Sequence, residues 1–182
     1  ELRQDAAFRV KMPPLRPSVS FLSSGLLFPR KQKEWNLPLE LANVSTLSVT
    51  LLKLHENNLG IYTPESGDAL DNAREIVRKS ISVKIPRNRA VNYALDLDSL
   101  IPGRQPGVYA VRISSPGTDG DVSRVLAVTD MAIQTVLDPL TRKAFVAVRS
   151  FETGAPASGA VVTLISRKNQ LLARGVTDAE GI

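Results

Sequence analysis

Few side chains in this sequence could take part in chemistry, and they are scattered. His55 is the only histidine, so any Ser-His-Asp arrangement or histidine-bound metal would have to include it. It follows an apolar run and precedes Asn57-Asn-Leu-Gly60, and no carboxylate stands in obvious register to orient its ring. We therefore interpret His55 as a strand-end or turn residue, and we expect no catalytic residue in the chain.

Closely spaced carboxylates are the next candidates, and they form three pairs: Asp96 with Asp98, Asp119 with Asp121, and Asp178 with Glu180. Paired carboxylates can act in acid–base catalysis, and their oxygens can bind Ca²⁺. The first pair alternates with apolar residues, which indicates the solvated face of a strand. The other two pairs lie beside glycines and lack the longer ligand pattern of a calcium site. We therefore expect no metal ion and no cofactor.

Cysteine is absent from the sequence, and no Gly-x-Ser-x-Gly motif is present. This excludes disulfides, thiolate nucleophiles and zinc–thiolate sites within the chain, and it leaves no serine nucleophile of the hydrolase type. The residues that could carry out bond-making chemistry are thus too few to favour an enzyme.

The net charge of +5 arises from 23 basic and 18 acidic residues that are spread along the chain. One local cluster, Arg30, Lys31 and Lys33, lies between two apolar runs, and we interpret it as a solvated hairpin loop. Aromatic residues make up only 5% of the sequence, whereas nucleic-acid surfaces interleave aromatics with clustered bases. No apolar run approaches the roughly 20 residues of a membrane span. Neither a nucleic-acid partner nor a membrane span is expected.

Alternating apolar and polar residues predict β-strands over much of the chain. Residues 35–41 alternate, and Pro38 on the outer face predicts an edge strand. Residues 47–51 alternate as well, and the apolar positions then shift register after Leu51, which predicts a β-bulge. Residues 43–46 would form a hairpin turn between these two strands. Helical spacing of apolar residues predicts one short helix over 68–79.

Further strands are predicted over residues 18–22, 81–85, 91–97, 107–115 and 123–129, which gives about seven strands, as in a sandwich of immunoglobulin size. Trp35, Tyr93 and Tyr109 fall on inward-facing positions, so we interpret them as core residues. Residues 1–17 are expected to be the end of a preceding unit and a proline-rich linker, because Pro13, Pro14 and Pro17 stiffen the chain there.

Asp130 marks a boundary, after which the strand pattern restarts. Residues 130–182 carry four more apolar, β-branched runs. The turns among them contain five residues that we interpret as structural: Gly154, Pro156, Gly159, Asp178 and Gly181. The sequence thus predicts a complete sandwich over 18–129 and the N-terminal part of a second one over 130–182, in an all-β chain cut from a longer protein.

Five motifs that occur in a fixed order carry a family resemblance. They are Asn36-Leu-Pro-Leu-Glu-Leu-Ala-Asn-Val44, Gly107-Val-Tyr-Ala-Val111, Val128-Thr-Asp130, the run from Ala144 to Thr163, and Thr177-Asp-Ala-Glu-Gly181. Together they resemble the macroglobulin-like domains in the N-terminal half of bacterial alpha-2-macroglobulins. The resemblance covers most of residues 18–182, and it implies tandem antiparallel sandwiches of the immunoglobulin or fibronectin kind.

The resemblance also implies a function, that of a structural scaffold in a broad-spectrum protease-trapping inhibitor of the bacterial periplasm. Such inhibitors serve in bacterial defence, either soluble or anchored to the inner membrane. The expected partners are neighbouring macroglobulin-like domains of the same chain, and target proteases reached through regions outside this sequence. Many members capture the protease with a Cys–Gln thioester, which would have to lie outside this cysteine-free stretch or be lacking. The alternative is an immunoglobulin-like or prealbumin-like adhesion or carbohydrate-binding module, which would expose aromatic or acidic residues at a sandwich tip.

Overall fold

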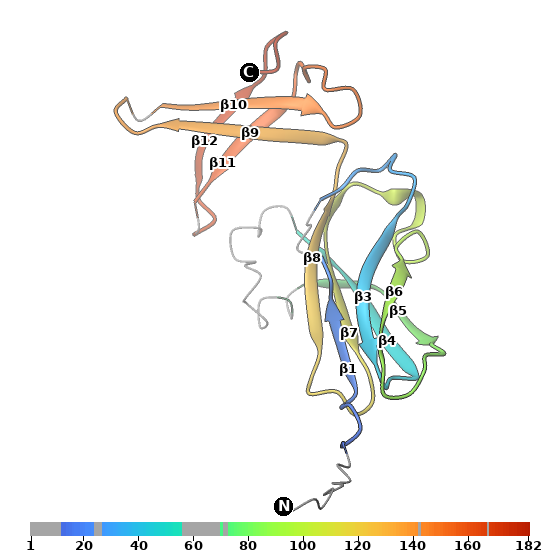
Figure 1. The fold of residues 1–182 in the computed structure, drawn as a ribbon. Coiled ribbons are helices and arrows are strands. Elements are labelled where there is room, and N and C mark those ends of the chain that lie inside the picture. Colours follow the sequence, from blue (N-terminus) through green and yellow to red (C-terminus); the bar gives the residue numbers. More distant parts are fainter. Residues whose placement is uncertain (1–11, 24–26, 56–69, 71–72, 142, 167) are drawn as a thin grey trace, which may run out of the picture.

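The structure is a computed structural model that describes residues 12–23, 27–55, 70, 73–141, 143–166 and 168–182. Within these residues it confirms the predicted all-β fold, and the remaining regular element is one short 3₁₀ helix, η3 (Pro102–Arg104). The strands form two parts that follow one another along the chain (Figure 1). We call residues 18–128 the first unit and residues 131–182 the second unit.

The first unit is a sandwich of two sheets. One sheet has three antiparallel strands in the order β1 (Ser18–Phe21), β3 (Asn36–Ala42) and β6 (Ala90–Asp96). The other has five strands in the order β2 (Leu27–Phe28), β8 (Val122–Val128), β7 (Gly107–Ser114), β4 (Thr46–Leu54) and β5 (Arg74–Ser82). Its strands are antiparallel except for β2, which runs parallel to β8.

Alternation along the strands places the core of the first unit between its two sheets. Leu37, Leu39 and Leu41 of β3 are fully buried, and they face the equally buried Leu47 and Val49 of β4. The Trp35 side chain, only 2% exposed, packs edge-on against Phe28 with ring centroids 6.2 Å apart. Burial of roughly 1.5–3 kcal/mol per large apolar side chain makes this core the main stabilising feature of the unit.

The predicted hairpin turn at residues 43–46 is wrong. Strand β3 pairs with β1 and β6, whereas β4 pairs with β5 and β7, so this turn carries the chain from one sheet to the other. The bulge predicted after Leu51 is confirmed by a register shift between Leu51 and Leu52. Beyond the bulge, Leu52 packs on the opposite face of the sheet with Leu70, which explains why β4 is apolar on both faces there.

The edge position predicted from Pro38 is also wrong, because β3 is the central strand of its sheet. Proline is accepted there for a local reason. The last residue of β1 is Phe21, and Leu22 donates its N–H to the Pro38 carbonyl at 3.0 Å, so the proline nitrogen faces the point where β1 ends. The missing N–H removes only the reciprocal bond to the Leu22 carbonyl, at the point where the pairing of β1 with β3 ends.

The helix predicted over 68–79 is wrong for residues 74–79, which belong to β5. Residues 68–69 and 71–72 of that prediction lie outside the described part of the chain. Val77 pairs with Leu51 and Ile81 with Leu47, so both apolar side chains reach the core from an extended strand. A spacing of four is an even number and suits one face of a strand as well as one face of a helix. Pairing with β4 decides between the two.

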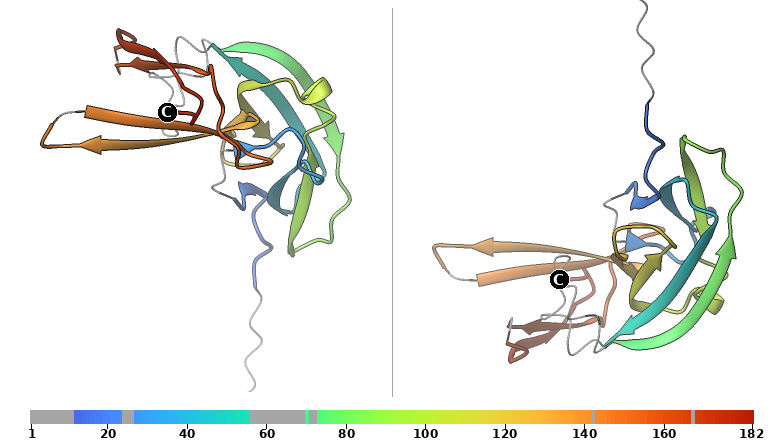
Figure 2. Two further views of the ribbon diagram at one scale, coloured as in Figure 1. Left: turned by 90° about the horizontal axis from the view of Figure 1, so that it is seen from above. Right: turned by 90° about the horizontal axis from the view of Figure 1, so that it is seen from below.

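The second unit consists of two antiparallel hairpins. The first hairpin joins β9 (Met131–Asp138) to β10 (Lys143–Ser150), and the second joins β11 (Val161–Ile165) to β12 (Leu171–Val176). The hairpins lie across one another beyond the end of the first unit (Figures 1 and 2). A cleft of about 410 Å³ separates their facing sides, and apolar side chains line most of it.

Candidate functional site: a polar junction between the two units

The two units are joined by two residues, Thr129 and Asp130, which lie between the end of β8 and the start of β9. The Asp130 carboxylate accepts two hydrogen bonds from Arg30, one from its backbone N at 3.2 Å and one from Nη1 at 3.1 Å. The Asp130 carbonyl accepts a third, from the backbone N of Phe151 at 2.8 Å. Asp130 therefore binds to both units at once.

Arg30 reaches Asp130 because β2 runs beside β8. This parallel pairing continues with Thr129 N donating to the Phe28 carbonyl at 3.3 Å, which brings the following loop to the linker. Arg104 then fixes the loop from the other side. Its Nη1 donates to the carbonyls of Arg30 and Gln32, each at 2.7 Å, and its own carbonyl accepts from Arg30 Nε at 2.8 Å.

Arg104 is itself held in two ways, by a carboxylate and by an aromatic ring. Its Nε and Nη2 each donate to one oxygen of Asp98 at 2.7 Å, which is the bidentate geometry that guanidinium and carboxylate favour. The guanidinium lies 4.9 Å from the Trp35 ring centroid, within cation–π range. Trp35 in turn donates Nε1–H to the Pro29 carbonyl at 3.0 Å. These contacts connect the buried core to the junction, and we call the set Asp98, Arg104, Arg30 and Asp130 the junction network.

The electrostatics of the junction network follow from these contacts. The hydrogen bond from Arg104 lowers the pKa of Asp98, and the same pairing raises the pKa of Arg104. Arg104 adopts a positive φ of 48°, next to Gly103 at 64°. A non-glycine residue in this region is uncommon, and the carboxylate and carbonyl contacts of Arg104 keep it there.

A second ion pair joins the units outside this network. Lys31 Nζ binds the Glu152 carboxylate, and the side chains are 69% and 54% exposed. Its hydrogen bond to Glu152 raises the pKa of Lys31. The interpretation of the Arg30–Lys33 cluster as a hairpin loop is wrong, because β2 and β3 lie in different sheets. The cluster is solvent-exposed at Lys31, but Arg30 and Lys31 also bind the linker and the second unit. Their acidic partners are about 100 residues or more away, so local sequence carried no signal of the pairing.

The glycines singled out from the sequence all adopt positive φ: 69° at Gly154, 74° at Gly159 and 79° at Gly181. Gly181 is also the most crowded, since a Cβ built there would lie 2.5 Å from the Val148 carbonyl oxygen. Its own carbonyl accepts the Val148 N–H at 2.8 Å. Pro156 forms an isolated bridge with Arg149, so the segment after β10 folds back onto that strand.

Asp178 organises the turn that follows β12. One carboxylate oxygen accepts the backbone N–H groups of Glu180 at 2.9 Å and Ile182 at 3.0 Å. These bonds, led by the one from Ile182, lower the pKa of Asp178. The buried Thr177 hydroxyl adds a bond to the Ala157 carbonyl at 2.6 Å. One Asp178 carboxylate oxygen is thus engaged by two backbone donors of the turn.

The other candidates for chemistry do not come together. His55 lies exposed just after β4, and Asp119 and Asp121 are exposed in the loop between β7 and β8. Asp96 accepts the Asp98 N–H at 2.9 Å as part of a turn. Among the described residues, no group of three histidine or carboxylate side chains is placed to hold a metal ion.

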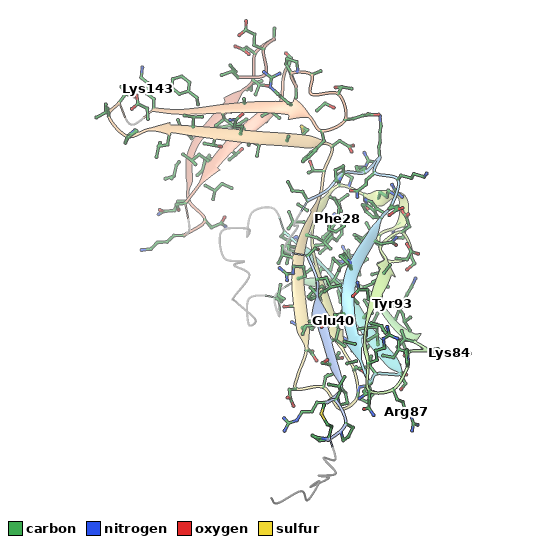
Figure 3. All side chains as sticks on the ribbon, in the orientation of Figure 1. Phe28, Glu40, Lys84, Arg87, Tyr93 and Lys143 are labelled. Atoms are coloured by element: carbon green, nitrogen blue, oxygen red, sulfur yellow. The ribbon has the colours of Figure 1, made fainter. Side chains whose placement is uncertain are left out.

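The three aromatic residues interpreted from the sequence as core residues do not form a surface binding platform. Trp35 and Tyr109 are buried, and Tyr93 is half-buried against the core. Tyr93 is labelled on the first unit in Figure 3. The Tyr109 hydroxyl donates to the Gln105 carbonyl at 3.0 Å, and burial raises its pKa. No helix in the described part of the chain has the length and apolar character needed to cross a membrane.

A two-sheet sandwich followed by crossed hairpins defines an all-β chain built from two successive units. Residues 128–182 match the family model described as the bacterial alpha-2-macroglobulin MG3 domain. This part of the chain is thus similar to a macroglobulin-like domain of bacterial alpha-2-macroglobulins. A comparison with curated protein sequences finds no match.

Solved structures extend the likeness to most of the chain. Native alpha-2-macroglobulin from Escherichia coli spanning domains NIE-MG1 superposes with a TM-score of 0.75 at 22% identity, covering 91% of this chain and 85% of that one. The same protein spanning MG0-NIE-MG1 gives 0.72 at 25% identity, covering 92% and 56%. A Salmonella alpha-2-macroglobulin mutant gives 0.68 at 24% identity, and here the chain spans only 10% of the matched protein. The matched folds thus belong to multidomain chains.

Proposed function

We propose that the chain is a non-enzymatic scaffold fragment of a bacterial alpha-2-macroglobulin, a periplasmic protease-trapping inhibitor. In this proposal residues 18–129 form a complete macroglobulin-like sandwich, and residues 130–182 form the N-terminal part of a second. The observation that carries the proposal is the match of residues 128–182 to the MG3 family model, directly after a first unit with a closed core.

The scaffold role fits the distribution of polar contacts. Those that span the two units are concentrated at the junction, where Arg30 binds Asp130 and Lys31 binds Glu152. A frame of this kind would hold two other regions of the parent protein in position: the bait segment that a target protease cuts, and the region that captures the protease. Those regions lie elsewhere in the proposal, and a thioester cannot form within a chain that lacks cysteine.

The proposed partners are neighbouring macroglobulin-like domains of the same polypeptide. The facing sides of the two hairpins carry exposed apolar residues such as Ile133, Phe145 and Leu164, which line the cleft between them. Exposed contiguous apolar surface of this kind is typical of an interaction site. In the proposal, further strands of the same sandwich complete this face, and proteases bind through other regions.

The experiment is to incubate the purified 182-residue chain with serine, cysteine and metalloproteases and to measure residual protease activity on a large protein substrate. We expect full protease activity at every ratio of chain to protease, and no peptide or ester hydrolysis by the chain alone. Stoichiometric inhibition by the chain would overturn the scaffold assignment.

A further inference from the structure

We propose that the junction network is a latch that sets the angle between the two units, and that Arg104 controls this angle although its recorded polar contacts all lie within the first unit. The inference deepens the proposed scaffold role. Its test measures geometry in the isolated chain, so it does not depend on protease trapping.

The first step of the argument is that the linker alone cannot fix the angle. It consists of Thr129 and Asp130, and each non-proline residue has two soft backbone dihedrals. The direction in which β9 leaves the first unit must therefore be set by contacts to the linker and by contacts between the units, such as the exposed ion pair of Lys31 with Glu152. The Asp130 carboxylate supplies the linker contacts through its two bonds to Arg30, while the Asp130 carbonyl fixes Phe151 of the second unit.

The second step is that the position of Arg30 depends on the conformation of the loop after β2, to which it belongs. The loop after β2 has few backbone bonds of its own, and Arg104 donates to two of its carbonyls. The Arg104 guanidinium is itself held by the Asp98 carboxylate after β6 and by the Trp35 ring at the core. A planar guanidinium can bind a carboxylate and two carbonyls together, and a lysine ammonium cannot reproduce this geometry.

The third step is that the contact closing the network is reversible. The Arg30 and Asp130 side chains are 40% and 44% exposed, so water can compete for both partners. Ion pairs of this exposure are weak one by one and are further weakened by salt. The junction is thus ordered by several cooperating contacts, each of which can open, and this is the property a latch requires.

The chain offers a clean way to test the latch because it has no cysteine. Asn92 on β6 and Gln134 on β9 are both exposed, so Asn92→Cys and Gln134→Cys can carry a pair of nitroxide spin labels, one on each unit. Pulsed electron–electron double resonance then gives the distribution of distances between the two spin labels, and hence between the units. We expect one narrow distribution for the otherwise native chain.

Two substitutions test the network at its opposite ends. Asp130→Asn removes the charge that Arg30 binds, and Arg104→Gln removes the donors that hold the loop. We expect both to broaden or shift the distance distribution, and we expect Arg104→Lys to give an intermediate width. The matched control is Arg78→Gln, which breaks an exposed arginine–carboxylate pair with Glu75 on β5, away from the junction, and should leave the distribution narrow.

Fluorescence of Trp35, the sole tryptophan, checks that each variant keeps a folded first unit. Should Arg104→Gln unfold it, Asp98→Asn withdraws the anchor of Arg104 more gently and carries the same expectation. An Arg104 or Asp98 variant that is folded and keeps the native distribution while Asp130→Asn broadens it would overturn the control by Arg104. A native distribution in all variants would overturn the latch itself. Inhibition of a protease by the chain would refute the scaffold role and leave these distances unaffected.

Discussion

The two units use the same material, antiparallel strands with alternating apolar residues, but they cover their apolar side chains to very different degrees. In the first unit, Leu39, Leu47 and Leu126 are completely buried between two sheets. In the second unit, Leu137 is 67% and Leu171 66% exposed, and among the described apolar residues of β9–β12 only Val148 is buried.

This difference shows that a sequence can form paired strands without burying their apolar side chains in a core. The hairpins of the second unit are held by their own backbone ladders and by turn contacts around Thr177 and Asp178. Two-stranded hairpins have marginal stability in water unless they pack against something. The first unit should therefore determine the cooperative unfolding of the chain, and the second should respond mainly to changes in its backbone and turns.

The largest expected effect is a direct comparison of one leucine from each unit. We expect Leu39→Ala to destabilise the first unit by about 2–5 kcal/mol, because it leaves a cavity in a packed core. We expect Leu171→Ala to change stability by no more than about 0.5 kcal/mol, because its side chain is already in water. Urea unfolding measures the first through Trp35 fluorescence, and amide hydrogen exchange across β11 and β12 measures the second.

An equal loss of stability in Leu39→Ala and Leu171→Ala would contradict the difference in burial between the two units. A large loss of protection in β11 and β12 on Leu171→Ala would mean that the hairpins bury this residue against each other in solution. The fluorescence readout is specific, because every tryptophan and tyrosine of the sequence precedes residue 131. Tryptophan and tyrosine signals therefore follow the first unit alone.

The next effect concerns the backbone of the second unit. Gly159→Ala forces a Cβ into a positive φ, at a cost of about 1–2 kcal/mol, but the new methyl group meets no atom within 4 Å. Gly181→Ala adds the clash with the Val148 carbonyl to the same strain and should cost clearly more. Amide exchange of Val148 and its neighbours should therefore accelerate far more in Gly181→Ala. Similar exchange rates in the two variants would show that backbone strain, not crowding, limits this turn.

The sequence allowed the strands, the inner faces and the bulge after Leu51 to be predicted, because all three depend on local periodicity. It did not allow the partner of each strand to be predicted. Residues 43–46 read equally well as a hairpin or as a crossover between sheets. The spacing of Leu70, Ala73, Ile76 and Val77 indicated a helix, although residues 74–82 form strand β5. Long-range pairing with β4 and β6 decided these cases, and that information is not contained in any short stretch.

The junction was the part of the candidate site least accessible from the sequence. Arg30 lies among basic residues that suggest a solvated loop, and Arg104 lies between two Pro-Gly turns that indicate only a connection. Both acquire partners because the parallel strand β2 and the helix η3 bring distant segments to one corner. The motif Val128-Thr-Asp130 did draw attention to the linker, although it gave no partner for Asp130.

A third prediction uses pH to test how the first unit supports the junction. Arg104 holds the pKa of Asp98 below its unfolded value of about 3.9, so the pair contributes stability above about pH 4 and loses it as the pH falls through the folded pKa. We expect Asp98→Asn to be less stable than the native chain at pH 7, and the difference to shrink at pH 3. Urea unfolding followed by Trp35 fluorescence at both pH values measures this. A difference that grows on acidification would contradict the assigned partnership.

The smallest effect is expected for Lys31→Gln, which removes the other ion pair between the units. Both partners are more than half exposed, and such pairs contribute little because water and salt screen them. We therefore expect an unchanged melting temperature and a distance distribution close to that of the native chain. If Lys31→Gln instead broadened the distribution as much as Asp130→Asn, the angle between the units would depend on total charge across the junction. The hydrogen bonds to Asp130 would then no longer explain how the first unit orients the second unit.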